Sequence, residues 1–244
     1  EGWGWFGRKE VPDLQLQPDF RELWESVDWK NLPDAAGSAI YKTGPHGYTH
    51  GWHFVGIPLE GDEAYASVKR PELSQDEESA LMMYGNKAGY TTVNPYLHHD
   101  GQVFELHKMA YVPAPPDRKA LAERMIPAMD SAFSKAPPLD HPVIAHRGTG
   151  NVEDMFGPVG SMVGKSFTSK AYTSTTTVPQ AHVGYGLQYE QKPGKLIIGI
   201  PAGSKVLHGN DFEHEVILPR NARFHVVSDE QDASTRQIRL EYQP

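Results

Sequence analysis

Cysteine is absent from this chain of 244 residues. Its absence excludes disulfide frameworks, thiolate nucleophiles and cysteine-based zinc sites. A chain without cysteine can also cross oxidising and reducing compartments without forming wrong disulfides, which is compatible with secretion followed by action in a cytosol. No apolar run approaches the roughly 20 residues that a bilayer-spanning helix needs, so we expect no membrane span.

Basic residues are also scarce, since 23 Lys and Arg stand against 31 Asp and Glu and give a net charge of −8. This balance argues against nucleic acid as the main partner. Glycine and proline are abundant, at 23 and 20 residues, which favours short strands and turns over a helical bundle. The chain starts at Glu1 rather than Met, and we expect it to be a processed or excised piece.

Helical patterns precede strand patterns along the chain. Residues 54–72 indicate a strand (FVGIPL) followed by an acidic connector. The stretch Ser74–Glu77 is a capping box that predicts a helix start, with the helix ending at Gly85 or Gly89. We expect Asn94-Pro95-Tyr96-Leu97 to break the chain, and a second helix to cover 117–134.

From residue 143 onward, short apolar segments alternate with Gly and Pro turns, which predicts strands. Helices followed by strands indicate an α+β fold, with N-terminal helices packed on two short, mainly antiparallel sheets in a sandwich or barrel-like pair. The predicted strands are Val143–Arg147, Lys165–Thr168, Ala171–Ser174, Lys195–Ile200, Lys205–Leu207, Glu215–Leu218, Ala222–Val227 and Thr235–Tyr242.

Three histidines lie close together in the sequence, at His46, His50 and His53. On a helix, such spacing could hold zinc. The interleaved glycines argue against a helix, so a glycine-rich loop with packed or exposed histidines is the favoured interpretation, and we expect no metal.

Two acids, Glu213 and Glu215, lead into the apolar run Val216–Leu218. In an extended chain, side chains two residues apart point to the same face, so both carboxylates could reach one target. Each negative charge raises the pKa of the other, an arrangement that proteins keep where a cationic or electron-poor species must be met. The alternative is a solvated edge with two ordinary surface acids.

Two further segments carry polar groups on strands. Arg147 ends an apolar strand and Gly148 follows, a pair that suits bidentate phosphate binding with close approach of a ligand to the backbone. The alternative for a strand-terminal arginine is a surface ion pair. Residues 173–177 (TSTTT) place hydroxyl groups on a strand, where they could hold a carboxylate or form a merely polar face.

Taken in this order, the three segments resemble the mono-ADP-ribosyltransferase toxins and effectors, and specifically the arginine-modifying class with its Arg, Ser-Thr-Ser, Glu-x-Glu signature. The signature reads here Arg147, Ser174-Thr175-Thr176 and Glu213-His214-Glu215. The resemblance covers about 74–242. Further matching tracts are 78–97, 129–148 and 199–227.

The resemblance has three departures. Thr176 replaces the last serine of the middle motif, and His146 precedes Arg147 where an aromatic residue is common. In the family, the helical segment that precedes the arginine strand commonly ends Asn-x-x-Leu-Arg, with that arginine on a cofactor phosphate. The corresponding positions here run from Asn94 to His98, so a histidine replaces the arginine. Histidine is a weaker, pH-dependent phosphate ligand.

The resemblance implies that NAD is consumed as co-substrate and that nicotinamide is released. Glu215 would stabilise the positive charge that develops on the ribose, and Ser174 would orient it. Arg147 would clamp the pyrophosphate and Gly148 would meet the nicotinamide amide. The further residues expected at the cofactor are Thr175, Thr176, His98 and Asn94.

Glu213 is implied as the element that selects the acceptor. An arginine side chain stays protonated, so an adjacent carboxylate can align it and take up a proton. Relatives with Gln at this position modify other acceptors. The loop 203–212 would contact the target, with Phe212 as the first candidate, and residues 177–189 occupy the place of the loop that folds over nicotinamide.

We therefore predict an NAD-dependent protein-arginine mono-ADP-ribosyltransferase, a glycosyltransferase-type toxin or effector that is secreted and acts in a target-cell cytoplasm. Residues 1–70 would be an N-terminal extension and 71–244 the catalytic domain. The expected partner is the target protein that carries the acceptor arginine, with a possible immunity or delivery protein. The alternatives are an NAD glycohydrolase, against which Glu213 argues, and a non-catalytic binding module on the same fold.

Overall fold

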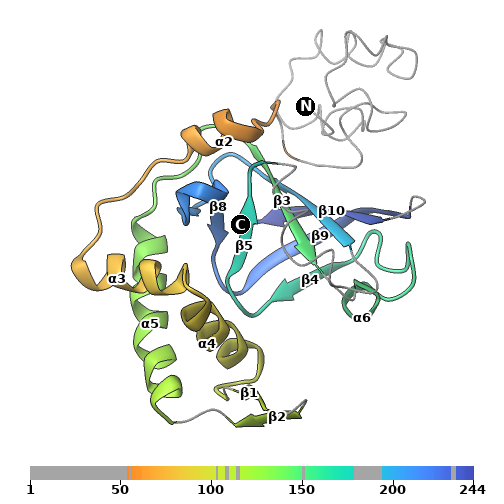
Figure 1. Ribbon diagram of the computed structural model, residues 1–244. Coiled ribbons are helices and arrows are strands. Elements are labelled where there is room, and N and C mark those ends of the chain that lie inside the picture. Colours follow the sequence, from red (N-terminus) through yellow and green to blue (C-terminus); the bar gives the residue numbers. More distant parts are fainter. Residues whose placement is uncertain are drawn as a thin grey trace, which may run out of the picture.

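The computed structural model describes residues 54, 56–102, 104–107, 110–113, 116–149, 152–178, 194–231 and 235–244. Figure 1 shows α3, α4 and α5 gathered on one side of the molecule and the larger sheet on the other. The helices are α2 (Gly61–Ser67), α3 (Gln75–Tyr84), α4 (Lys87–His98), α5 (Pro116–Lys135), α6 (Val152–Phe156) and the 3-10 turn η8 (Asp211–Glu213).

The strands form one eight-stranded sheet and one two-stranded sheet. The larger sheet has the order β4-β9-β10-β6-β3-β5-β8-β7, and every neighbouring pair in it is antiparallel except β6 and β10. The predicted α+β class is confirmed. The strands are β1 (Phe104–His107), β2 (Ala110–Pro113), β3 (Val143–Thr149), β4 (Ser166–Ser169), β5 (Thr173–Thr176), β6 (Gly194–Ile200), β7 (Leu207–His208), β8 (Glu215–Leu218), β9 (Ala222–Gln231) and β10 (Arg236–Gln243).

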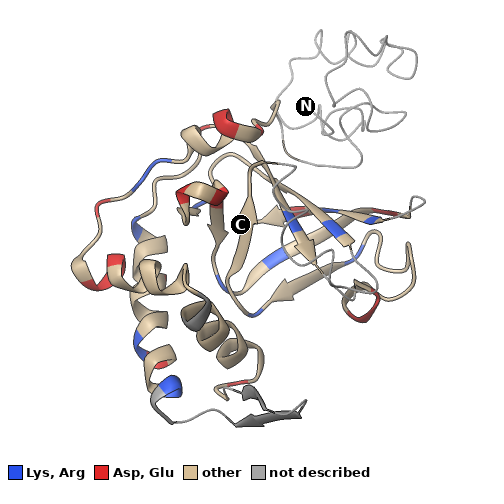
Figure 2. Cartoon of the chain, viewed as in Figure 1, with Lys and Arg blue, Asp and Glu red and all other residues tan. Residues whose placement is uncertain are grey.

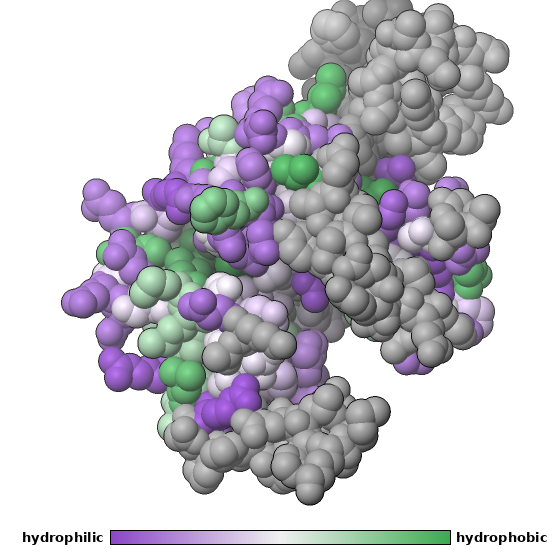
Figure 3. Space-filling model, viewed as in Figure 1, coloured by the Kyte–Doolittle hydropathy of each residue, from purple (hydrophilic) through white to green (hydrophobic). Residues whose placement is uncertain are grey.

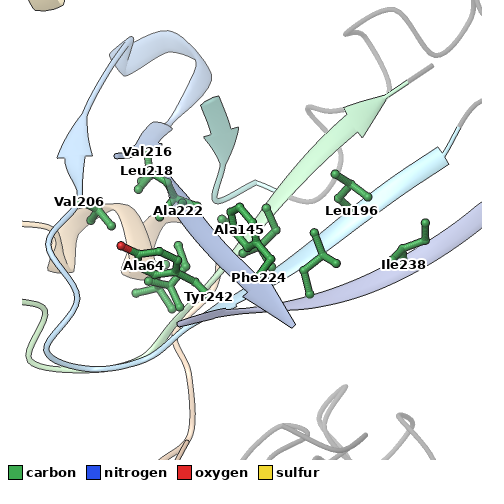
Figure 4. Close-up of a cluster of buried hydrophobic side chains, with 14 of the residues drawn as sticks. Ala64, Ala145, Leu196, Val206, Val216, Leu218, Ala222, Phe224, Ile238 and Tyr242 are labelled. Carbon is green, nitrogen blue, oxygen red and sulfur yellow. The ribbon is translucent and has the colours of Figure 1, made fainter. Parts of the chain in front are cut away.

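Two hydrophobic clusters hold the described residues together. One packs side chains of β3, β6, β8, β9 and β10 against α2 and α6 (Figure 4). The other joins α3, α4 and α5 to β7, to β8 and to Tyr172, the residue just before β5. Strand β8 belongs to both, because Val216 and Leu218 enter the first cluster and Ile217 enters the second. Burial on both faces explains why this strand is an unbroken apolar run.

Glu215 shares a face of β8 with Ile217, since side chains alternate along a strand. Ile217 packs in the helical cluster that includes Tyr84 and Tyr172. The first residue of β8 is therefore turned toward the helical layer, at the end of a strand that packing fixes on both faces.

The start of α3 is confirmed. The Ser74 amide donates to the Glu77 carboxylate at 2.8 Å and the Glu77 amide donates to the Ser74 hydroxyl at 3.3 Å, which is the predicted capping box. Gly85 is the C-cap, as one of the two predicted ends. The second helix, predicted for 117–134, is α5. None of the helices in the described ranges is long and apolar enough to cross a membrane.

Several sequence-based expectations about secondary structure were wrong. The segment 54–59 forms no strand among its described residues, where Leu59 makes only an isolated bridge to Val143. The strand predicted for Lys205–Leu207 begins only at Leu207, as β7. Pro95 does not break the chain but lies inside α4, because proline removes only one helical hydrogen bond and the helix is held by packing of Val93 and Leu97. The acidic connector contains a helix, α2, whose Ala64 enters the sheet-side core together with Val68, the residue that caps the helix C-terminus. Strand β5 begins two residues after the predicted Ala171.

Candidate active site

The sheet topology brings the three sequence motifs side by side. Strands β3, β5 and β8 are neighbours, with His146 paired to Thr176 and Thr176 paired to Glu215. Residues separated along the chain by as many as 69 positions therefore lie in one row across three strands. The arginine, hydroxyl and acid segments therefore meet beside the end of β5 and the start of β8.

Arg147 is the cation of the site. Its Nη1 donates to the backbone carbonyl of Ser174 at 2.8 Å, and its side chain is exposed at the end of the buried part of β3. Its charge also lowers the pKa of Glu215. The guanidinium and the carboxylate thus act on each other across β5, in a position where the guanidinium is open to an anionic ligand.

Glu215 is a buried carboxylate, only 7% exposed. Burial raises its pKa, and the charge of Glu213 raises it further, while a hydrogen bond from the Asn210 amide, the Ser174 hydroxyl and the charge of Arg147 lower it. The Asn210 amide donates to Oε1 of Glu215 at 2.9 Å. The hydrogen bonds therefore hold the carboxylate in one place, while burial, the largest effect, keeps its pKa above the ordinary value.

Gly209 permits this placement. A Cβ atom at this position would lie 2.0 Å from Oε1 of Glu215, a distance that no real Cβ contact tolerates. The backbone of Gly209 also donates to the Glu215 carbonyl at 2.9 Å. The sequence reasoning missed both Gly209 and Asn210, although the Gly-Asn pair six residues before the acid is a turn signal.

Tyr84 links the helical layer to the site. Its phenol lies 3.0 Å from the hydroxyl of Ser174 and accepts from the side-chain amide of Asn94 at 3.2 Å. Tyr84 is 1% exposed, and burial raises its pKa, so it remains a neutral hydroxyl. Sequence reasoning missed this residue because a tyrosine on a helical apolar face is read as core.

The other two hydroxyl residues of the middle motif face the protein. Thr175 and Thr176 are buried, and their hydroxyls donate to the carbonyls of Val216 at 2.7 Å and Glu213 at 2.6 Å. They tie β5 to β8 and to η8. Contact with the cofactor stays a prediction for both, but the hydroxyl of each already holds the segment that carries the acids.

Glu213 does not lie on the strand with Glu215, which corrects the extended arrangement expected from the sequence. Glu213 ends the 3-10 turn η8, which the Asn210 side chain caps by accepting from the Phe212 amide at 2.9 Å. His214 then takes a left-handed conformation with φ 47°. The two-residue alternation therefore stops at Glu215, although the charge of Glu213 still raises the pKa of Glu215.

Phe212 is 99% exposed at the middle of η8. A phenylalanine gains nothing from full exposure in the free molecule, so this side chain is available to a partner. It lies next to Glu213, as the predicted contact of the loop with a target requires. The loop 203–212 is described throughout, whereas most of the predicted nicotinamide loop, from 179 on, lies outside the described residues.

His98 is the last residue of α4. Partial desolvation lowers its pKa, and neighbouring basic side chains, Arg147 among them, lower it further. It therefore lies near Arg147 but is biased toward the neutral form, which weakens it as a phosphate ligand. Gly148 continues β3 and pairs with Lys195. For both residues, contact with the cofactor stays a prediction.

The chemistry of these groups fits a dinucleotide substrate. An exposed guanidinium stands beside a buried carboxylate, and Oδ1 of Asn94 is buried without a hydrogen-bond partner among the described residues. Within the same part of the chain, no group of three or more His, Asp or Glu side chains is arranged for a metal ion. His46, His50 and His53 lie outside the described residues.

The comparisons with known proteins agree with this geometry. A family model described as ADP-ribosyltransferase exoenzyme matches residues 61–243. No curated protein matches the chain in sequence.

Several solved structures share the fold. An ADP-ribosyltransferase from Clostridium botulinum has a TM-score of 0.56 and 18% identity, covering 77% of this chain and 99% of that one. A protein from S. aureus, solved with NAD, has a TM-score of 0.55 and 15% identity, covering 76% and 97%. The ADP-ribosyltransferase Vis in complex with agmatine has a TM-score of 0.51 and 19% identity, covering 77% and 88%; the Vis toxin comes from Vibrio splendidus.

Proposed function

The chain belongs to the ADP-ribosyltransferase exoenzyme family, whose enzymes transfer ADP-ribose from NAD, and we propose that its acceptor is an arginine side chain of a target protein. The observation that carries this proposal is the placement of Glu213 one turn before the buried Glu215, beside the fully exposed Phe212. One acid is buried where a dinucleotide would react, and the other stands on the outer turn where an acceptor would arrive.

NAD supplies the reaction with a nicotinamide leaving group on a ribose. Glu215, once ionised, stabilises the positive charge that develops on that ribose when nicotinamide departs. Ser174 orients Glu215, and Tyr84 fixes the Ser174 hydroxyl from the helical side at 3.0 Å. Arg147 offers its guanidinium to the pyrophosphate, and its bond to the Ser174 carbonyl keeps it in register with the acid.

Glu213 acts on the acceptor. A guanidinium is protonated at every physiological pH and is a poor nucleophile. A carboxylate at hydrogen-bond distance aligns it and accepts the proton that is lost when the new N–C bond forms. Agmatine, bound by Vis, carries a guanidinium on an aliphatic chain as arginine does, which supports arginine as the acceptor in this fold. Secretion and action in a target-cell cytoplasm belong to the same proposal, which the description of the family as exoenzymes supports.

The test uses the full chain with labelled NAD and either agmatine or cell lysate. We expect label on protein bands, ADP-ribosyl agmatine by mass spectrometry, and arginine as the modified residue in digested targets. Glu215→Ala should abolish transfer and NAD hydrolysis. Glu213→Gln should abolish transfer while some hydrolysis persists, and the exposed Glu230→Gln on β9 should change neither.

Three results would overturn the assignment. Release of free ADP-ribose alone by the wild-type chain would make it an NAD glycohydrolase, and modification of a residue other than arginine would remove the role given to Glu213. A chain that binds NAD but produces neither product would be a binding module on this fold.

A further inference from the structure

The loop that carries Phe212 and Glu213 is fastened to helix α2, which lies outside the part of the chain in which the sequence motifs were found. The carboxylate oxygen Oδ1 of Asp211 accepts both from the Tyr65 phenol on α2 and from the Arg70 guanidinium just after it. Figure 2 shows the acidic side of α2 and the acidic turn η8 as neighbouring red segments.

A second set of contacts runs between the same two segments. The Tyr65 ring stacks on His208 with centroids 4.4 Å apart and meets His214 edge-on at 4.9 Å. A ring nitrogen of His208 lies 3.0 Å from the Tyr65 carbonyl, and a ring nitrogen of His214 lies 3.0 Å from the Asp62 carboxylate. Tyr65 therefore touches the loop before, within and after η8.

Tyr65 and Asp211 keep their protonation states over a wide pH range. Desolvation and the hydrogen bond to Asp211 raise the pKa of Tyr65 to about 12, so the phenol keeps its proton. The hydrogen bond from Tyr65 and the charge of Arg70 lower the pKa of Asp211, so the carboxylate stays ionised. Tyr65 therefore remains the donor and Asp211 the acceptor at physiological pH.

Space lies beside the same loop. An open cavity of about 440 Å³ separates residues 207–210 from α3 and is lined on the loop by His208, Gly209 and Asn210. Figure 3 shows apolar surface between α2 and α3, where this cavity opens. A loop that borders an open cavity is not supported by close packing there, so directed contacts from α2 carry more of its positioning.

Glu215 is held by other means. It begins β8, whose next three residues are fully buried, and its carboxylate accepts from the Asn210 amide. The contacts from α2 reach Asp211, one residue before Phe212 and two before Glu213. Support for the acceptor-facing turn is thus separable from support for the acid that acts on NAD.

We propose that Tyr65 and Arg70 are positioning residues that hold, through Asp211, the turn bearing Phe212 and Glu213 in the orientation that receives the acceptor arginine. This inference rests on the proposed function. When the contacts between α2 and Asp211 are weakened, η8 can move, and a smaller fraction of the enzyme is ready to receive the acceptor. The groups that act on NAD, Glu215 and Ser174, keep their positions.

The experiment compares transfer to agmatine with NAD hydrolysis in the full chain carrying Tyr65→Phe, Arg70→Ala or Asp211→Asn. Tyr65→Phe removes the hydroxyl but keeps the ring that stacks on His208. We expect kcat/KM for transfer to fall by about 3- to 10-fold, the size of one lost hydrogen bond, with the hydrolysis rate and the KM for NAD unchanged. The Tyr65→Phe/Asp211→Ala double variant should lose no more than Asp211→Ala alone, because alanine leaves the Tyr65 hydroxyl without this acceptor.

Lys69 and Asp140 provide a matched control. They form an exposed ion pair at 2.8 Å, with side chains about as exposed as those of Arg70 and Asp211, but not on the acceptor loop. Lys69→Ala and Asp140→Asn should leave both rates unchanged. Hydrogen exchange of the 207–214 peptide should quicken in Tyr65→Phe and not in Lys69→Ala.

Equal losses of transfer and hydrolysis in Tyr65→Phe would mean that the contacts of Tyr65 and Arg70 with Asp211 only stabilise the fold. Unchanged transfer in all three variants would mean that these contacts have no role in transfer. Either result overturns the inference while leaving the proposed function standing. Failure of the wild-type chain to modify agmatine or protein arginine is a different result, which overturns the proposed function itself.

Discussion

The hydroxyl groups of Tyr84 and Ser174 lie 3.0 Å apart, and this contact joins the helical layer to the catalytic edge of the sheet. Tyr84 comes from α3 and Ser174 from β5, 90 positions apart in sequence. The same phenol accepts from the Asn94 amide. Two helices therefore determine how the serine hydroxyl meets Glu215, and the orientation of that acid depends on helix packing as well as on strand register.

Removing the Tyr84 hydroxyl with Tyr84→Phe should weaken both reactions. Ser174 loses a fixed partner and Asn94 loses its acceptor, so we expect unfolding free energy to fall by about 0.5–1.5 kcal/mol. Transfer and NAD hydrolysis should fall together by about 3- to 10-fold. Chemical denaturation and kinetics measure the two effects. Tyr96→Phe, which removes an exposed hydrogen bond from Tyr96 on α4 to Glu123 on α5, is the control and should leave both rates unchanged.

Gly209→Ala should eliminate activity. The new Cβ would fall 2.0 Å from Oε1 of Glu215, so either the carboxylate or the loop must move. We expect loss of both transfer and hydrolysis in a protein that still folds, as circular dichroism would show. Gly85→Ala is the comparison, because its Cβ would find its nearest neighbour at 3.4 Å. Wild-type hydrolysis in Gly209→Ala would disprove the tight placement of Glu215.

The acid limb of the pH–rate profile should respond to Glu213. Glu215 acts as a carboxylate, so hydrolysis rises with pH through its raised pKa. Burial is the main cause of that rise and Glu213 adds to it. Glu213→Gln removes one negative charge, so the pKa of Glu215 falls and the limb moves to lower pH. Hydrolysis rates between about pH 4 and about pH 8 would show this, with Glu230→Gln as the unshifted control. A shift of the acid limb to higher pH in Glu213→Gln would contradict this prediction.

Stability in acid should depend on Glu77. The Lys135 ammonium lies 2.6 Å from its carboxylate and, with hydrogen bonds at Ser74, lowers its pKa to about 2. A depressed folded-state pKa gives stability that is present above the ordinary value of 4.5 and is lost as pH falls toward 2. Denaturation curves of Glu77→Gln should lose that pH dependence. Glu78→Gln, one residue on and exposed, should keep it.

The sequence predicted those parts of the fold that depend on local chemistry. The capping box at Ser74 needs only side chains three residues apart, and the apolar run after Glu215 needs only burial. Prediction from the sequence failed where tertiary packing overrides the local preference of a segment for helix, strand or turn. Pro95 is accommodated inside α4, and the acidic residues 61–67 form a helix because Ala64 and Val68 are buried. The η8 turn was missed because its cap comes from Asn210, which competes with extended pairing.

By itself, the sequence determined which chemical groups this protein possesses: a strand-terminal arginine, a hydroxyl-rich strand and two acids before an apolar run, with no thiol. Side-chain types and their local spacing suffice for that. Only the tertiary structure decided which groups touch. Sheet order placed Arg147 and Glu215 on either side of β5, helix packing brought Tyr84 to Ser174, and α2 reached Asp211 across 146 positions. Such contacts arise from the burial of distant segments in a common core, and no short stretch of sequence encodes them.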